Sequence, residues 1–517
     1  MSLVRRFSLA ALLAAMVGAG PSAHAQEAAV PESMSGRDPD AIAAVLAARQ
    51  LVAEGKNNEA VVEANKALAK DPTFPEALVA KGDAMRAAED YAGAAKVYSD
   101  ALNFGPNSVA AYNGRGECYM EIGQTDVAMD DFRNAQERDP NNAQVLSNIG
   151  HLLVNNVRDP ESAVRVLGDA IALNDQDARA YRDRGMAHAQ LSEFDDAVAN
   201  LQKASEVDPN DHENYQMLAA IYQLQEVYEP SIGALTTAIE VYQPKKRSDP
   251  EKFVDGYLMR ADAWLKVGEK ETDPAKRQAA FESAIADCDA LLAIYEDRFP
   301  QSGIALFRRG RALRMLERYS DAIVSLTRAI QIAPAGQEAP YAAEALMYRG
   351  ICWYYIGSND LARGDFEQAS ATGGGYQDPR IFLWIGFTHH AEEDFRVAID
   401  SYSEAIAKDS DFAIAYVNRG RAYADLREYG KAIESFNNAI RVEPSNAEHY
   451  YKSGVAYMRL EDFERAAYFL DLALHQDNAA PKMYRAMATT LRELGRDELA
   501  NEFDRKAEAP AKPAGGG

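Results

Sequence analysis

The sequence predicts an all-α fold made of a long row of paired helices, and three repeating observations support this prediction. Apolar residues recur at helical spacing along a first segment, small and aromatic residues do the same along a second segment, and a proline closes the pair. The whole pattern returns about every thirty-four residues. The clearest unit is Ala413–Asn446, in which the repeating residues are Tyr416, Gly420, Tyr423, Ala432, Phe436, Ala439 and Pro444.

The two segments of this unit are expected to form a helical hairpin. Tyr416, Gly420 and Tyr423 are four and three residues apart, so they share one face of the first helix. Gly420 has no side chain, which lets a neighbouring helix approach closely, and Pro444 cannot continue the second helix. Because one hairpin cannot bury both apolar stripes alone, each unit needs a neighbour on either side.

These residues resemble the signature of the tetratricopeptide repeat family. The resemblance implies a right-handed superhelical solenoid of about twelve helix-turn-helix repeats with a C-terminal capping helix, and a protein that binds other proteins. The capping segment runs from Pro481 to about Lys506 and has a polar outer face. The predicted units are Ala41–Phe74, Pro75–Ser108, Val109–Asn142, Ala143–Asp177, Ala178–Asp211, His212–Lys245, Val254 to about Arg298, Gly303–Gly336, Ala343–Asp378, Pro379–Phe412, Ala413–Asn446 and Ala447–Ala480.

Residues 1–25 are predicted to be a secretory signal peptide. Arg5 and Arg6 precede a short apolar run, Leu9–Val17, which is too short for a stable membrane span. Ala23 and Ala25 place small side chains at the processing positions, so we expect cleavage after Ala25. No cysteine follows the cut, so a lipid anchor is not indicated. The protein is expected to be exported to the bacterial periplasm or exterior; the alternative is an uncleaved anchor or a misassigned start.

The rest of the chain divides into two predicted arrays. Residues 26–40 form a flexible lead-in, 41–245 the first array, 246–253 a connector, 254–507 the second array with its cap, and 508–517 a disordered tail. The charged, turn-rich segment Pro244–Pro250 is either a hinge or a surface insertion. The seventh unit is predicted to have a swollen turn at Gly268–Lys276 and a long second helix.

Composition limits the kinds of partner. The chain carries a formal net charge of −24, which disfavours nucleic acid and anionic lipid surfaces because both need a positive field. We interpret the excess acid as a source of solubility for a long exposed rod. The three cysteines, Cys118, Cys288 and Cys352, fall in separate units and are predicted to be unpaired and buried.

No motif in the sequence indicates catalysis, a cofactor or a metal site. The nucleophile elbow, the zinc-binding H-E-x-x-H pattern and the phosphate-binding loop are all missing. His389 and His390 are adjacent, so they face different directions on a helix, and a core role is expected for His389. The chain is therefore predicted not to be an enzyme.

The family resemblance places partner binding on the inner face, lined by the first helix of each unit. Exposed aromatic and arginine side chains there are typical of interface centres. The alternative is that adjacent units bury these rings between them. Function is predicted to be that of a scaffold or adaptor; the alternative is a recruiting or regulatory subunit of a cell-envelope enzyme or secretion system, with catalysis in trans. The predicted groove residues are Phe307, Arg308, Arg311, Tyr348, Tyr355, Leu383, Trp384, Phe387, Tyr451 and Lys452.

Overall fold

A computed structural model describes residues 34–243, 253–295, 301–332, 341–372, 378–476 and 480–508. Within these ranges the chain is helical, with no β-strand. Contacts divide it into two units, Met1–Gly256 (unit 1) and Tyr257–Gly517 (unit 2), and the division falls in the first turn of α14 (Val254–Lys270). The predicted all-α repeat fold is confirmed in each unit.

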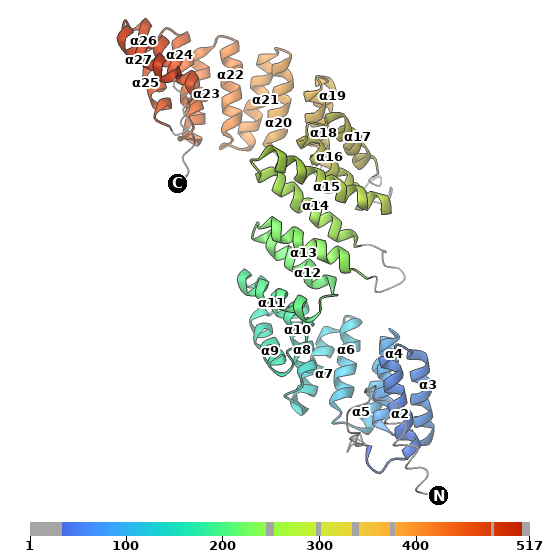
Figure 1. Ribbon diagram of the computed structural model, residues 1–517. Helices are drawn as coiled ribbons and strands as arrows, with labels where there is room; N and C mark the ends of the chain where they lie inside the picture. The colour runs from blue at the N-terminus through green and yellow to red at the C-terminus, as the bar shows by residue number, and fades with distance from the viewer. Residues whose placement is uncertain are drawn as a thin grey trace. The chain divides into compact units, whose positions relative to one another are not determined.

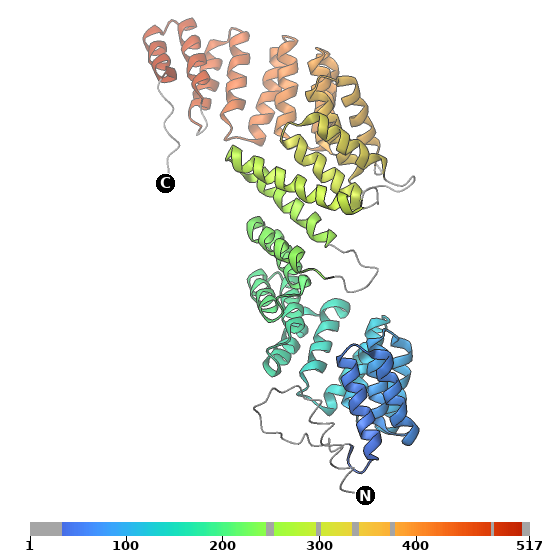
Figure 2. The same cartoon turned by 45° about the vertical axis from the view of Figure 1, so that its right-hand side comes forward.

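Unit 1 consists of helical hairpins in which the two helices of a hairpin pack most extensively against each other, and each second helix also packs against the first helix of the next hairpin. Successive hairpins lie side by side in both views (Figures 1 and 2). Its helices are α2 (Pro39–Ala53), α3 (Asn57–Lys70), α4 (Pro75–Ala87), α5 (Tyr91–Phe104), α6 (Val109–Glu121), α7 (Thr125–Arg138), α8 (Ala143–Leu152), the π-helix η2 (Leu153–Val157), α9 (Pro160–Leu173), α10 (Ala178–Gln190), α11 (Phe194–Val207), α12 (His212–Leu224) and α13 (Tyr228–Val241).

Unit 2 repeats the same arrangement and ends in the predicted cap, which is a pair of helices. The five charged residues predicted to face solvent there, Arg492, Glu493, Arg496, Asp497 and Glu498, are all exposed. Besides α14, its helices are α15 (Pro274–Tyr295), α16 (Gln301–Met315), α17 (Tyr319–Gln331), α18 (Ala342–Tyr355), α19 (Asn359–Ala371), α20 (Pro379–Ala391), α21 (Phe395–Lys408), α22 (Ala413–Asp425), α23 (Tyr429–Val442), α24 (Ala447–Arg459), α25 (Phe463–Leu474), α26 (Pro481–Glu493) and α27 (Asp497–Glu508).

The turns inside the described hairpins share one backbone feature, except for the connection between α14 and α15. One residue there adopts a left-handed conformation, which reverses the chain after the last turn of the first helix. Glycine takes this position in some units, for example Gly123 (φ 76°), but most units use a residue with a side chain, such as Arg427 (φ 61°). These turn residues follow the period of the sequence, so the hairpins share one geometry.

The extra residue of the fourth unit is absorbed by a local widening of the first helix. η2 follows α8 directly, and Arg158 then takes the left-handed position (φ 60°). A π-turn accommodates one additional residue without breaking the helix. The remaining contacts of that hairpin therefore keep their register.

The predicted lead-in needs a correction at its C-terminal end. Met34 is 1% exposed and packs in the first core cluster with Phe74. The Asp38 carboxylate accepts hydrogen bonds from the backbone N–H groups of Asp40 (2.8 Å) and Ala41 (3.3 Å), which caps α2. Proline is favoured in the first turn of a helix. Pro39, which was expected to belong to the lead-in, therefore marks the beginning of the helical array.

Several predictions fall wholly or largely outside the described residues. These are the signal peptide at 1–25, most of the connector at 246–253, and the tail beyond residue 508. The seventh unit is described: its predicted long second helix is confirmed as α15, whereas its predicted swollen turn is wrong. Its extra residues lengthen the two helices, to 17 residues in α14 and 22 in α15, so the connection between them is only Glu271–Asp273. In the described part of the chain, no helix combines the length and apolar character needed to cross a bilayer.

Candidate functional site

All ten predicted groove residues lie on the first helices of unit 2. α16 carries Phe307, Arg308 and Arg311, α18 carries Tyr348 and Tyr355, α20 carries Leu383, Trp384 and Phe387, and α24 carries Tyr451 and Lys452. The structure separates them into buried apolar side chains, arginines held in ion pairs, residues near the cap, and an accessible aromatic group.

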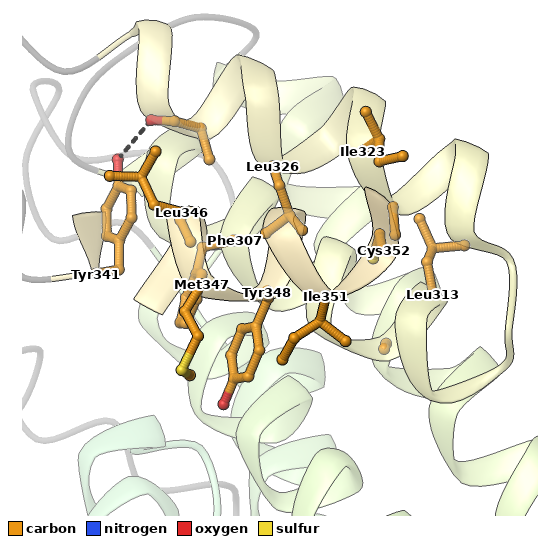
Figure 3. Packing of buried hydrophobic residues seen from close by; sticks show 14 of the residues in the cluster. Phe307, Leu313, Ile323, Leu326, Tyr341, Leu346, Met347, Tyr348, Ile351 and Cys352 are labelled. Atoms are coloured by element: carbon orange, nitrogen blue, oxygen red, sulfur yellow. Dashed lines mark hydrogen bonds between the residues drawn. The ribbon is translucent and has the colours of Figure 1, made fainter. Parts of the chain in front are cut away.

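Phe307, Tyr348 and Leu383 are buried, which corrects their assignment as exposed groove contacts. Their exposures are 8%, 8% and 5%. The Phe307 ring stacks on Tyr341 (centroids 5.5 Å apart) and on Tyr348 (6.0 Å). Figure 3 shows these rings within the largest core cluster, with Met347 beside them. Close packing of α16 against α18 buries these rings between adjacent units. For these residues the structure therefore agrees with the alternative interpretation of the sequence, in which adjacent units bury the aromatic rings.

The two predicted arginines of α16 are engaged within the protein. Arg308 pairs with Asp262 and Arg311 pairs with Glu269, and both acids lie on α14. Burial raises the pKa of Asp262, and the neighbouring Arg308 opposes that rise. These pairs join α14 to α16 and leave less of the two guanidinium groups available to a partner.

The residues of α24 are also partly occupied. Lys452 pairs with Glu448 at 3.0 Å, one helical turn away. Tyr451 is half-buried against the cap, and the Lys482 ammonium nitrogen lies 5.1 Å from the centre of its ring. These two residues therefore connect the last repeat to the cap.

The accessible part of the predicted site is a row of contacting rings, here called the aromatic ladder. Tyr319 stacks on Tyr355 at 4.9 Å, and Tyr355 meets Trp384 edge-on at 6.0 Å. Trp384 contacts Phe387 at 5.1 Å, and Phe387 contacts Tyr402 at 6.0 Å. The members of the aromatic ladder are Tyr319, Tyr354, Tyr355, Trp384, Phe387 and Tyr402, from α17, α18, α20 and α21.

Exposure is uneven along the aromatic ladder. Tyr355 is 54% exposed, whereas Tyr354, Trp384 and Phe387 are half-buried and Tyr402 is fully buried. Tyr354 packs edge-on against Trp384 at 5.5 Å, and burial raises its pKa. The ladder therefore rests on the core at Tyr402 and presents an apolar surface around Tyr355 and Trp384.

Two arginines lie beside the aromatic ladder. The guanidinium carbon of Arg314 is 4.8 Å from the centre of the Tyr348 ring. Arg421 of α22 opposes the rise in the pKa of both Tyr354 and Tyr402, so its charge is close to these rings. The sequence analysis missed Arg421, Tyr319 and Tyr402 as site residues. Arg421 is the ninth residue of its unit, the position that Arg311 has in its own, so the repeat numbering contained a signal for it.

The corresponding helices of unit 1 carry a largely buried network of polar side chains instead. Asn148 is fully buried, and its amide donates to Asn113 (2.9 Å) and to Glu117 (2.9 Å). Glu117 also pairs with Arg86 at 2.8 Å, and Arg179 donates to Asn148 at 3.2 Å. These groups satisfy one another's hydrogen-bonding capacity across neighbouring repeats.

The cysteines lie outside the aromatic ladder, and so does the contact of His188 with Glu193. Cys118, Cys288 and Cys352 are buried and unpaired, as predicted, and burial raises the pKa of each thiol, to about 12 for Cys118 and Cys352. A buried thiol of high pKa is a poor nucleophile. His188 contacts an exposed carboxylate, Glu193, at 2.7 Å, which is an ordinary contact at a hairpin turn.

Comparison with known proteins gives matches along most of the described chain. A model of the tetratricopeptide repeat matches residues 45–109, 155–212, 277–340, 390–441 and 419–481, and a second model of the same repeat matches residues 109–142. The chain is 30% identical over 136 residues to small glutamine-rich tetratricopeptide repeat-containing protein 2 of Mycosarcoma maydis, which covers 26% of this chain and 38% of the relative.

A second relative is Hsp70-Hsp90 organizing protein 3 of Arabidopsis thaliana, 23% identical over 248 residues, or 45% of this chain and 41% of the relative. The chain thus spans less than half the length of these two relatives. Among solved structures, the APC/C hetero-tetramer Cut9-Hcn1 matches 91% of this chain and 96% of that chain at 14% identity, with a TM-score of 0.37.

Proposed function

Because the chain belongs to the tetratricopeptide repeat family, we propose that it is a scaffold or adaptor that holds a segment of a partner protein against the aromatic ladder of unit 2. The observation that carries this proposal is the ladder itself: rings from four helices are in continuous contact, and Tyr355 at its surface is 54% exposed. Contiguous apolar surface of this kind is typical of protein-binding sites.

The composition of the surface supports a protein partner. Tyrosine and tryptophan are enriched among residues that dominate binding energy, because they bury a large area and have few rotatable bonds. Tyr355 and Trp384 have this character, and stacking on Tyr319 holds the Tyr355 ring in place before a partner arrives. Preorganised side chains lose less entropy on binding.

We also propose that the protein is not an enzyme and does not bind nucleic acid. The three thiols are buried with raised pKa values, and the net charge of −24 repels phosphates. The relative named Hsp70-Hsp90 organizing protein is named for organising other proteins, which agrees with a scaffold. Export rests on the predicted signal peptide, and the mass of the protein recovered from the source cells tests it: mature protein is expected to begin at Gln26.

Site-specific crosslinking tests the binding face. Tyr355 is replaced by the photo-crosslinker p-benzoylphenylalanine, and the matched control carries the same replacement at Tyr468, which is 62% exposed on the second helix α25. We expect a defined partner band in source-cell extract from position 355 and none from position 468. Adding the substitution Trp384→Ala to the position-355 protein should remove the band while circular dichroism stays unchanged. Equal crosslinking from both positions, or a band that survives Trp384→Ala, would contradict the proposal.

A further inference from the structure

Arg314 and Arg421 differ from the other arginines around the aromatic ladder because neither has a carboxylate partner among the described residues. Arg308 and Arg311 are paired with acids of α14. Arg349, on α18, donates to both oxygens of Asp365. The described contacts of Arg314 and Arg421 are with neutral groups or aromatic rings.

The contacts of Arg314 leave its hydrogen-bonding capacity unused. One terminal nitrogen, Nη2, contacts the sulfur of Met315 at 3.1 Å, and the guanidinium lies over Tyr348. Its Nε is buried and, like that of Arg311, has no hydrogen-bond partner among the described residues. A ligand would therefore be bound by the terminal nitrogens of Arg314 and not by Nε. Burial raises the pKa of Tyr319, the first ring of the aromatic ladder; the charge of Glu317 adds to this rise and that of Arg314 opposes it, so both charges are close to the ring.

Arg421 stands beside Tyr354 and Tyr402, the other part of the aromatic ladder. It is exposed, and within the described ranges Nη1 donates to one acceptor, the amide oxygen of Asn418, at 3.3 Å. The acid one turn further along α22, Asp425, instead accepts a hydrogen bond from His390 Nε2 at 2.9 Å. The charge of Arg421 is therefore available to a ligand.

The geometry points to an acidic peptide segment as the partner, and this inference rests on the proposed function. A large apolar or aromatic side chain of the segment packs on Tyr355 and Trp384, and carboxylates on either side of it pair with Arg314 and Arg421. Arginine binds carboxylates through two parallel hydrogen bonds, and the bond is stronger where water is excluded by neighbouring rings.

Charge complementarity selects this occupant over others. Two unpaired cations at an apolar surface, in a chain of net charge −24, form a local exception that attracts carboxylates and repels basic segments. Single-stranded nucleic acid also stacks on aromatic side chains, but it needs a positive groove along its backbone. Two arginines in an acidic protein do not supply one.

Fluorescence anisotropy with synthetic labelled probes tests the inference on the full-length protein. The acidic probe has one tryptophan between two clusters of aspartate, joined by glycine-serine spacers of graded length. Matched probes carry asparagine or lysine instead of aspartate, and oligothymidylate represents nucleic acid. We expect the acidic probe to bind at least about tenfold more tightly than each of the other probes, with an affinity that falls as salt is added.

Variants identify the two cations. Arg314→Gln and Arg421→Gln should each weaken acidic-probe binding about tenfold, which is the scale of one charged hydrogen bond at an interface. Arg465→Gln is the control, because that side chain is 69% exposed on α25, away from the aromatic ladder. Arg421 is exposed, so Arg421→Gln should leave the fold intact. If Arg314→Gln disturbs the packing over Tyr348, Arg314→Lys, which keeps the positive charge, serves as the second variant at this position.

The outcomes separate this inference from the proposed function. Equal binding of the asparagine or lysine probe, tighter binding of oligothymidylate, unchanged affinity in both arginine variants, or no binding of any probe would each overturn the acidic-segment inference. Crosslinking of a partner at position 355 would still support the scaffold function in those cases. Both the acidic-segment inference and the proposed function would be overturned by a third result. In that result no partner crosslinks at position 355, and binding of the acidic probe is unchanged by Trp384→Ala.

Discussion

Gly420 of α22 faces the ring of Phe436 of α23 so closely that a Cβ atom at Gly420 would lie 2.5 Å from the Phe436 Cε1 atom. The same relationship, between positions that are sixteen residues apart in the sequence, recurs for Gly350 and Phe366. In the fourth unit the pair is Gly150 and Leu167, one residue further apart, as the π-turn requires. The contact between this glycine and this large apolar side chain sets how closely the two helices of a hairpin approach.

Gly420→Ala is therefore expected to destabilise the protein although alanine favours helix. The added methyl group must displace the Phe436 ring, and overpacking of this kind costs about 1–3 kcal/mol. Urea unfolding followed by circular dichroism measures the change. The control is Gly430→Ala in α23, where nothing lies within 4 Å of the new Cβ; it should keep or raise stability by about 0.5 kcal/mol. Equal effects of the two substitutions would contradict the steric explanation.

Buried and exposed members of the predicted groove should respond differently to truncation. Phe307 is 8% exposed and lies in the core, so Phe307→Ala should lower the free energy of unfolding by about 3 kcal/mol. Tyr355→Ala removes mainly its stacking on Tyr319 and should cost about 1 kcal/mol. Crosslinking or binding assays should then show that Tyr355→Ala impairs partner binding in a folded protein. A larger loss of stability for Tyr355→Ala than for Phe307→Ala would show that the surface is assigned wrongly.

The sequence was sufficient to predict the helices because their limits depend on local signals. Glycine at the close approach and proline at the end act within one unit, and Ala413 is both the predicted first residue of its unit and the first residue of α22. The accessible surface depends instead on packing between units. Phe307 and Tyr355 both belong to groove positions of the repeat, but only the neighbouring helix decides that one is buried and the other 54% exposed.

Two residues of the candidate site show why the remainder was not predictable. Tyr402 occupies the core position that Phe436 has in the next unit, yet its ring also contacts Phe387 of the aromatic ladder. Arg314 lies on the same helix as the predicted arginines Arg308 and Arg311, but the acids of α14 pair with those two and not with Arg314, which has no carboxylate partner among the described residues. Contacts that depend on three helices at once do not produce a regular residue spacing that could be recognised in the sequence.

Asp365→Ala should be strongly destabilising, while Asp365→Ser should be tolerated better. Asp365 Oδ2 and Oδ1 accept hydrogen bonds from Arg349 Nε (2.8 Å) and Nη2 (2.7 Å). Removing the acid leaves a mostly buried guanidinium unpaired, and we expect a loss of about 2–3 kcal/mol. In the unit Ala413–Asn446, Ser435 fills the corresponding position, and its hydroxyl accepts a hydrogen bond from Arg419 Nε at 3.3 Å. Serine at position 365 should therefore retain part of the interaction.

The control for this pair is Asp360→Ala, because the Asp360 side chain is 91% exposed and should contribute less than about 1 kcal/mol. The three variants are compared by urea unfolding under identical salt. If Asp365→Ser were as destabilising as Asp365→Ala, the unit-to-unit equivalence of this contact would be wrong.

The three thiols should be almost unreactive until the chain unfolds. Burial raises the pKa of Cys118 and of Cys352 from 9.0 to about 12, which lowers the thiolate fraction near neutral pH about a thousandfold. Cys288 is 1% exposed and its pKa is raised by the same cause. Ellman's reagent should therefore titrate no thiol promptly in the native protein and three in concentrated urea. Because reaction then requires local opening of a repeat, Gly420→Ala, in a unit without cysteine, should accelerate it less than Gly350→Ala, whose hairpin contains Cys352. A thiol that reacts at once in the native protein would show that its helix face is open to solvent, and that the repeat around it is not packed as described.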